Sequence, residues 1–213
     1  MDLLDGLRTA VGPSGTLLMP AYTSNSQMKP PRAFDVTREP TYTGVVNEVF
    51  RRSPDVIRSL HPRHSICGTG PLAEALLSGH ERCVRADGPN SPFDRLRRRN
   101  DAIILTLGLQ PGFVSFLHWV EDFEPAKLPI AVHETEPVAC LVRDSSGREI
   151  EVKDWQLRQA VAASVSFSRI GSRLSSNAMR FFEHRGVTIG LYPLEPLTVE
   201  LLALRDNGVI HYQ

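Results

Sequence analysis

Two adjoining stretches indicate the fold: Ala102-Ile-Ile-Leu-Thr-Leu-Gly108 and Phe113-Val-Ser-Phe-Leu-His-Trp-Val-Glu-Asp-Phe123. The first is a short apolar run that glycine ends, which predicts a buried strand over 102–107. In the second, Phe113, Phe116, Leu117 and Val120 recur at helical spacing and predict a helix over 113–123 with these residues on its buried face. A buried strand followed closely by a helix is typical of proteins that mix the two elements.

The same alternation of patterns extends through the rest of the chain and indicates an α/β or α+β domain. Thr43 is a candidate cap for a helix with Val45, Val46, Val49 and Phe50 on its apolar stripe. Asp144-Ser-Ser-Gly147 has the composition of a hairpin turn between two strands. The expected helices are 2–11, 44–52, 71–79, 92–99, 155–165, 172–185 and 195–206, and the expected strands are 16–19, 138–143, 149–154 and 188–192.

Length and composition exclude several classes of protein. The 213 residues suffice for one domain with a core, and 41% hydrophobic with 23% charged residues is ordinary globular composition. No apolar run reaches the roughly 20 residues of a membrane span, and the first residues do not resemble a secretory signal. With 24 basic and 24 acidic residues the chain lacks the positive charge of a nucleic-acid binder. Three scattered cysteines favour a reducing, cytoplasmic location over a disulfide framework.

The charges cancel overall but are unevenly distributed along the chain. Arginines outnumber the one acid, Asp55, between residues 51 and 63, whereas acids outnumber Lys127 between 118 and 136. We expect an anionic cofactor beside the first segment and a cationic substrate beside the second. Two exposed surfaces without functional polarity are the alternative.

The predicted helix over 113–123 carries the first candidate site. Helical spacing places Ser115, His118, Glu121 and Asp122 on one face, opposite the apolar residues. A histidine beside a carboxylate gains basicity and a fixed tautomer, as a general base requires. A solvated helix face with an incidental histidine remains the alternative.

The second candidate site is the segment Arg58-Ser-Leu-His-Pro-Arg-His-Ser65. Its arginines are suited to phosphate, and Pro62 keeps the segment out of a helix. A polar loop with capping serines is equally consistent with this composition. The proline-rich stretch 23–42 is either the rim or lid of a pocket or a plain surface loop.

A metal centre and a cysteine nucleophile are weaker alternatives. Histidines are available at positions 61, 64, 80, 118 and 133, but the His61-Pro-Arg-His64 spacing is not that of a helical zinc motif. We therefore expect no metal. Cys67 has no neighbouring feature in the sequence that lowers a thiol pKa.

Several motifs occur in a characteristic order: Gly15-Thr-Leu-Leu-Met-Pro-Ala-Tyr-Thr23, Gly44-Val-Val-Asn-Glu-Val-Phe-Arg-Arg52, Arg58-Ser-Leu-His-Pro-Arg-His-Ser65, Leu105-Thr-Leu-Gly108 and Ser115-Phe-Leu-His-Trp-Val-Glu121. This series resembles the aminoglycoside 3-N-acetyltransferase family, most clearly from residue 3 to 124. The resemblance implies a single α/β/α-type layered domain with a mixed sheet over 1–213. It also implies transfer of an acetyl group from acetyl-CoA to the 3-amino group of an aminoglycoside or a related amine.

The resemblance also implies roles for individual residues. His118 would accept the proton of the substrate amine, and Glu121 would stabilise the imidazolium. The expected residues on the cofactor side are Arg58, Ser59, His61, Ser65 and Ser115, and those that attract the cationic amine are Asp35, Asp122 and Glu124. The partner is then a small cationic amine rather than nucleic acid or a membrane, and the protein is a monomer or homodimer.

The sequence departs from this family in two ways. Members usually begin about 40 residues earlier with a further helix and strand, so the expected domain is N-terminally short. Ser115 stands where the family usually has threonine, and it keeps the hydroxyl group. A relative that binds cofactor poorly or serves as a binding or interaction protein is therefore the alternative to an active enzyme.

Overall fold

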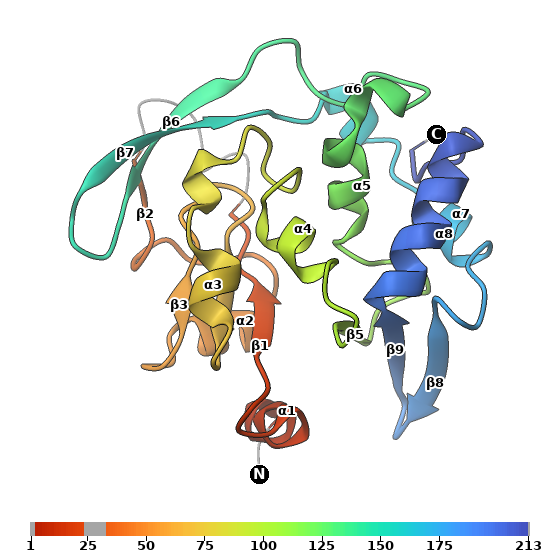
Figure 1. Cartoon of the computed structure of the whole chain (residues 1–213), viewed down its shortest axis with the longest axis horizontal. Coiled ribbons are helices and arrows are strands. Elements are labelled where there is room, and N and C mark those ends of the chain that lie inside the picture. Colours follow the sequence, from red (N-terminus) through yellow and green to blue (C-terminus); the bar gives the residue numbers. More distant parts are fainter. Residues whose placement is uncertain (1–2, 24–32, 213) are drawn as a thin grey trace. The chain divides into compact units, whose positions relative to one another are not determined.

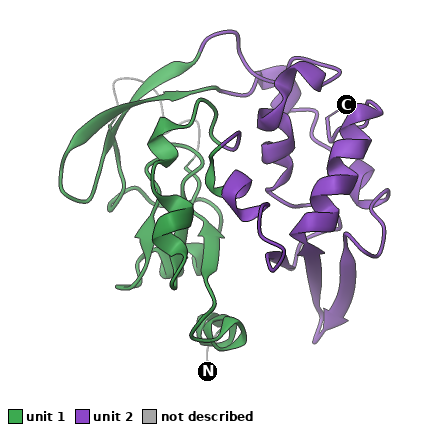
Figure 2. Ribbon diagram, in the orientation of Figure 1, with its two compact units in different colours: residues 1–86, 90–92, 137–155 green, residues 87–89, 93–136, 156–213 purple. Residues whose placement is uncertain are grey.

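The computed structural model describes residues 3–23 and 33–212 (Figure 1). The chain forms two units, each of which is described by itself (Figure 2). Unit 1 comprises residues 1–86, 90–92 and 137–155, and unit 2 comprises residues 87–89, 93–136 and 156–213. None of the helices in the described ranges is both long and apolar enough to cross a membrane.

The first sheet of unit 1 is antiparallel, has the strand order β1-β4-β3 and pairs Met19 with Cys67. Leu4, Met19 and Phe50 form the core of this region with Cys67, because α1, β1, α2 and β4 each turn one apolar side chain inward. The elements are α1 (Leu3–Val11), β1 (Leu17–Pro20), α2 (Val45–Arg51), β3 (Ile57–Arg58), β4 (Ile66–Thr69), α3 (Ala73–Leu77) and the 3₁₀ turn η2 (His80–Arg82).

The second sheet of unit 1 is mixed and has the order β2-β6-β7, with β2 (Ala33–Asp35), β6 (Val138–Arg143) and β7 (Glu149–Asp154). Strand β2 runs parallel to β6, and β6 and β7 form the long hairpin of Figure 1. Gly147 has a φ of 87° and Asp144 accepts hydrogen bonds from Ser146 and Arg148, so the predicted hairpin turn is confirmed. Inward residues Val142 and Val152 pack with Phe34 and Val36.

Unit 2 contains an antiparallel sheet of order β5-β9-β8, formed by β5 (Ile103–Leu107), β8 (Arg180–His184) and β9 (Val187–Pro193). Its helices are α5 (Leu117–Phe123), α6 (Gln159–Ala162), α7 (Ser168–Gly171) and α8 (Leu194–Asp206), with the 3₁₀ turn η3 (Pro125–Lys127). Helix α4 (Pro92–Leu96) begins in unit 1 and continues in unit 2. Helix α8 buries Leu194, Leu197 and Leu201, which confirms the predicted last helix.

The structure corrects two predicted helices. The expected helix 172–185 is wrong, because residues 180–184 form β8, paired along its length with β9. There Phe181 packs edge-on against Tyr192 of β9, with ring centroids 5.8 Å apart, and this contact between the strands favours their pairing. The expected helix 155–165 shortens to α6. Of the candidate rim 23–42, residues 24–32 lie outside the described residues.

Two predictions of burial are also wrong. Strand β5 forms as expected, yet Ile103 and Leu105, which lie on the same face of the strand, are exposed. In α2 the exposed side chains are Val45, Val46 and Val49, and of the expected stripe only Phe50 is buried. The Thr43 hydroxyl donates to the carbonyl of Pro20 instead of capping this helix, whose N-cap is Gly44. The single domain expected over 1–213 stays a prediction.

Candidate active site

Helix α5 presents His118 near its N-terminus. The helix begins at Leu117, so Ser115 lies in the preceding turn, where its carbonyl accepts the His118 backbone N–H at 3.1 Å. The expectation that Ser115 shares a helical face with His118 is therefore wrong. Phe113 is also not on the buried face: it is 43% exposed and packs on Phe167 at a centroid distance of 4.2 Å.

A close approach of two backbones fixes the turn before α5. A Cβ added to Gly112 would lie 2.4 Å from the carbonyl oxygen of Phe167, and one added to Gly171 would lie 2.5 Å from that of Pro111. Gly112 also has a φ of 82° and donates its N–H to the Tyr192 hydroxyl at 3.1 Å. These glycines let the turn pack on α7 and so determine where α5 begins.

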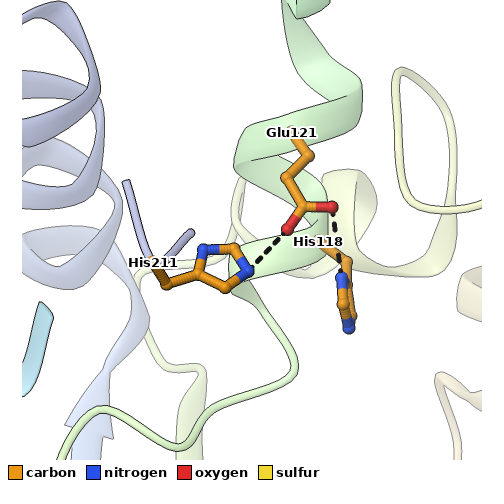
Figure 3. A group of neighbouring side chains, drawn as sticks. All are labelled: His118, Glu121 and His211. Carbon is orange, nitrogen blue, oxygen red and sulfur yellow. Dashed lines mark hydrogen bonds and ion pairs between the residues drawn. The ribbon is translucent and has the colours of Figure 1, made fainter. Parts of the chain in front are cut away.

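The carboxylate of Glu121 is buried and contacts three side chains of unit 2. Its Oε2 lies 3.3 Å from Nδ1 of His118, and its Oε1 lies 2.8 Å from Nε2 of His211. The Tyr212 hydroxyl donates to Oε1 at 2.7 Å. Figure 3 shows the two imidazoles on either side of the carboxylate. No motif in the sequence marks His211 or Tyr212, which reach the site from the last described residues.

The protonation of this group follows from its geometry. Burial works to raise the pKa of Glu121, but the neighbouring His118 and His211 outweigh it and hold that pKa well below its ordinary value. An ionised carboxylate only accepts hydrogen bonds, so the His118 nitrogen facing it, Nδ1, carries a proton. The lone pair of the neutral imidazole is then on Nε2. Since Glu121 and Asp122 are both buried, the alternative of a solvated helix face is excluded.

The two other acids of this helix region have partners within unit 2. Asp122 is buried, with Oδ1 3.2 Å from Nε2 of His133 and Oδ2 accepting the backbone N–H of Asp87 at 3.0 Å. Glu124 is half-exposed and pairs with Lys127 at 2.9 Å and with Arg205 at 3.1 Å. The negative charge of the 118–124 segment is therefore largely balanced by neighbouring cations and imidazoles.

In unit 1, Arg58 connects three parts of the backbone. Its Nε donates to Ser65 Oγ at 2.8 Å, and its Nη1 and Nη2 donate to the carbonyls of Glu39 and Ala21, each at 2.6 Å. The guanidinium also lies 4.8 Å from the ring centre of Phe34, and burial lowers the pKa of Arg58 to about 10. Arg58 therefore holds the segment in place.

Ser59 and His61 are buried in the same segment, and the tautomers of His61 and of His80, the partner of Ser59, can be assigned. His80 Nε2 donates to the carbonyl of Ala86 at 2.6 Å, so its Nδ1 accepts from the Ser59 hydroxyl at 2.8 Å. His61 Nδ1 accepts the backbone N–H groups of Arg63 and His64, which places the ring proton on Nε2. The rings of His61 and His80 stack at 4.9 Å.

The basic stretch 51–63 does not form the expected positive surface. Arg51 and Arg52 both pair with Glu48 at 2.7 Å. Arg63 is buried and contacts Asp154 at the end of β7, with Nε 2.9 Å from Oδ2. Carboxylates outside the stretch 51–63, one of them 91 residues away from its partner, therefore pair with these arginines, and a charge count over the stretch does not detect them.

Asp35, expected to attract a cationic substrate, ends β2 in unit 1. Its Oδ1 accepts from the backbone N–H and hydroxyl of Thr37 and from the backbone N–H of Arg38. Burial opposes ionisation, but the hydrogen bonds from Thr37 and Arg38 lower the Asp35 pKa. The structure thus gives Asp35 the bonding pattern of a turn-capping aspartate.

The sequence profile of the aminoglycoside 3-N-acetyltransferase family matches residues 1–198. The chain belongs to this family. Among individual relatives it is 34% identical over 134 residues to aminoglycoside N(3)-acetyltransferase IV of Salmonella sp., covering 62% of this chain and 48% of that protein. It is 32% identical over 142 residues to aminoglycoside N(3)-acetyltransferase III of Serratia marcescens, covering 58% and 51%. The chain spans about half the length of these curated relatives.

Solved structures support the expected α/β fold of this acetyltransferase family. The chain matches AAC(3)-Xa with a TM-score of 0.78 at 21% identity, covering 98% of this chain and 80% of that one. It matches AAC-IIIb in binary complex with CoASH with a TM-score of 0.76 at 19% identity, covering 99% and 84%. For AAC-VIa bound to sisomicin the TM-score is 0.74 at 24% identity, with 96% and 84% covered.

The structure also bears on the two weaker alternatives, a metal centre and a cysteine nucleophile. Within residues 3–23 and 33–212, one grouping of potential metal ligands has suitable spacing: His118, Glu121 and His211, whose ligand atoms lie within 4.8 Å of one another. Burial raises the pKa of the Cys67 thiol to about 11, so Cys67 is protonated at neutral pH and unsuited to nucleophilic attack.

Proposed function

We propose that the chain is an acetyl-CoA-dependent N-acetyltransferase that transfers the acetyl group to the 3-amino group of an aminoglycoside or a related amine. The observation that carries this proposal is the buried, ionised Glu121 at 3.3 Å from Nδ1 of His118, which leaves the Nε2 lone pair as the base. Family membership supports the reaction class. The CoASH and sisomicin complexes of AAC-IIIb and AAC-VIa support the two reactants.

In the proposed reaction, His118 Nε2 removes a proton from the substrate ammonium, and the resulting neutral amine attacks the thioester carbonyl. A C–N bond forms, the C–S bond breaks, and CoA leaves as a thiolate that takes up the second proton lost by the attacking nitrogen. The imidazolium formed on His118 is stabilised by the Glu121 carboxylate. A positioned general base of this kind contributes about 10²–10⁴-fold to the rate.

We propose a role on the cofactor side for the segment 58–65 within unit 1 and, separately, for Ser115 within unit 2. Arg58, Ser59 and Ser65 are assigned the role of shaping this wall, because their polar atoms bond to the protein itself. His61, buried and fixed by two backbone N–H groups, has the same role. Rigid walls of this kind bind a cofactor with little loss of side-chain entropy.

For the cationic amine we assign the first electrostatic contact to Glu124, whose side chain is 38% exposed. We propose that Asp122 and Asp35 act indirectly, by holding the neighbouring backbone in place, because their oxygens accept hydrogen bonds from backbone N–H groups. Exchanging Glu124 for Gln should therefore raise KM more than it lowers kcat.

The proposal is tested by incubating the protein with acetyl-CoA and a panel of aminoglycosides while following the release of free thiol. His118→Ala should lower turnover by about 10²–10⁴. His184→Ala, which removes an exposed imidazole of β8, is the matched control and should be as active as the parent. Folded parent protein that releases no thiol with any amine overturns the proposal. If calorimetry then detects no CoA binding, the chain is a non-catalytic relative.

A further inference from the structure

The carboxylate of Glu121 is held from two sides, and only one side belongs to the H-x-x-E motif. Oε2 faces His118, whereas Oε1 has two further neighbours from the chain's last described residues. Those neighbours are the imidazole of His211 and the hydroxyl of Tyr212, both buried. A glutamate side chain can turn its carboxylate about the last bond, so what contacts Oε1 determines where Oε2 points.

The segment that carries these two groups is itself anchored within unit 2. The carbonyl of His211 accepts the Ser166 N–H at 2.6 Å, and Tyr212 pairs with Val165 in an isolated β-bridge. Arg169 donates to the Tyr212 carbonyl, and the His211 ring lies nearly parallel to Phe167 at 5.6 Å. Donors on a fixed backbone pre-organise the carboxylate at little entropic cost.

We propose that His211 and Tyr212 are positioning residues that clamp Oε1 of Glu121, so that Oε2 stays directed at His118. The proposal rests on the proposed function. The titratable groups at this carboxylate are His118, His211 and Tyr212, and Arg169 is the cation bonded to the Tyr212 backbone.

Three variants test the clamp. His211→Gln retains an N–H donor of similar reach but no titratable group, His211→Leu removes both, and Tyr212→Phe removes one donor. We expect His211→Leu and Tyr212→Phe to lower kcat about 10-fold with KM within about twofold of the parent, as for a lost hydrogen bond to a charged group. His211→Gln should keep kcat within about threefold.

The direction of Oε2 is tested, independently of turnover, by the NMR signal of the His118 Nδ1 proton in protein without substrate. In His211→Gln this signal should stay as in the parent, whereas in His211→Leu and Tyr212→Phe it should shift or broaden because Oε2 is no longer held in place. Far-UV circular dichroism checks that each variant folds. If His211→Leu does not fold, His211→Gln and Tyr212→Phe still decide the question.

The outcomes distinguish this inference from the proposed function. A parent that releases no thiol overturns the function, whereas the NMR signal of the His118 Nδ1 proton still tests the clamp. Parent-like kcat in Tyr212→Phe and His211→Leu, together with an unchanged His118 Nδ1 proton signal in both variants, overturns the inference. A stoichiometric divalent metal in the purified parent that is lost in His211→Gln also overturns it, because His211 would then be a metal ligand.

Discussion

Replacement of Asp154 by Asn should destabilise unit 1 more than the replacement of an exposed charged residue. Asp154 is fully buried and contacts Arg63 twice over, with Nε 2.9 Å from Oδ2 and Nη2 3.0 Å from Oδ1. The contact joins the end of β7 to the segment 58–65. The amide of Asn keeps the shape but removes the charge, so the buried guanidinium of Arg63 loses its carboxylate.

The expected magnitude follows from that burial. Removing one partner of a buried ion pair costs about 3–5 kcal/mol, because the remaining charge is left in a poorly solvated site. Arg63 keeps its hydrogen bond to the carbonyl of Trp155 at 2.9 Å, which places the expected cost near the lower end, about 3 kcal/mol. At an m-value of about 2 kcal/mol/M this lowers the urea midpoint by about 1.5 M.

Urea denaturation followed by far-UV circular dichroism provides the measurement, with Glu149→Gln as the matched control. Glu149 lies on the same strand and pairs with Arg143 at 2.7 Å, but both side chains are more than two-fifths exposed. The control should lose no more than about 0.5 kcal/mol. A cost below about 1 kcal/mol for Asp154→Asn, or equal costs for both variants, would refute the reasoning.

Four further outcomes follow from the structure. A hydrogen bond from Arg51 lowers the pKa of Glu48 to about 2, so Glu48→Gln should lose about 1–2 kcal/mol at neutral pH, and its difference from the parent should vanish as the pH falls from about 4.5 to 2 in an acid titration. Cys67, with a thiol pKa of about 11, should not react with a disulfide reagent at pH 8 until urea unfolds the protein. Gly112→Ala should lower the free energy of unfolding by about 2 kcal/mol and the melting temperature by several degrees, because Gly112 has a positive φ and the added Cβ would approach the Phe167 carbonyl oxygen too closely. Val45→Thr, at a side chain 80% exposed, should stay within about 0.5 kcal/mol of the parent.

The sequence predicts the local elements of this fold better than their burial. The hairpin 138–154 and the last helix carry strong local signals, an Asp-Ser-Ser-Gly turn and a proline at the helix start, and both form. Strand β8 was missed because its extended form depends on pairing with β9 and on the Phe181–Tyr192 contact. The exposure of Val45 and Ile103 could not be predicted, because periodicity identifies an apolar face without showing whether another element covers it.

In the candidate site, too, the local contact could be predicted from the sequence and the long-range contacts could not. His118 and Glu121 are three residues apart on one helix, so their contact follows from helical geometry alone, whatever the rest of the fold does. The partners of Glu121 at Oε1 lie about 90 residues further along the chain, and a contact of that separation leaves no periodic signal. The same is true of Arg63 and Asp154, which lie 91 residues apart.

These long-range partners change how the neutral net charge is to be understood. A count along the chain places a positive stretch at 51–63 and a negative one at 118–136, which favours two charged surfaces. In the structure Arg51, Arg63 and Asp122 are buried against groups of opposite or compensating charge. Charges paired inside a protein contribute little to its long-range field, so they cannot steer a polycationic substrate. We therefore expect that the proposed recognition of a cationic amine depends on short-range contacts with half-exposed acids such as Glu124, and that KM rises with salt less steeply than the sequence charge pattern implies.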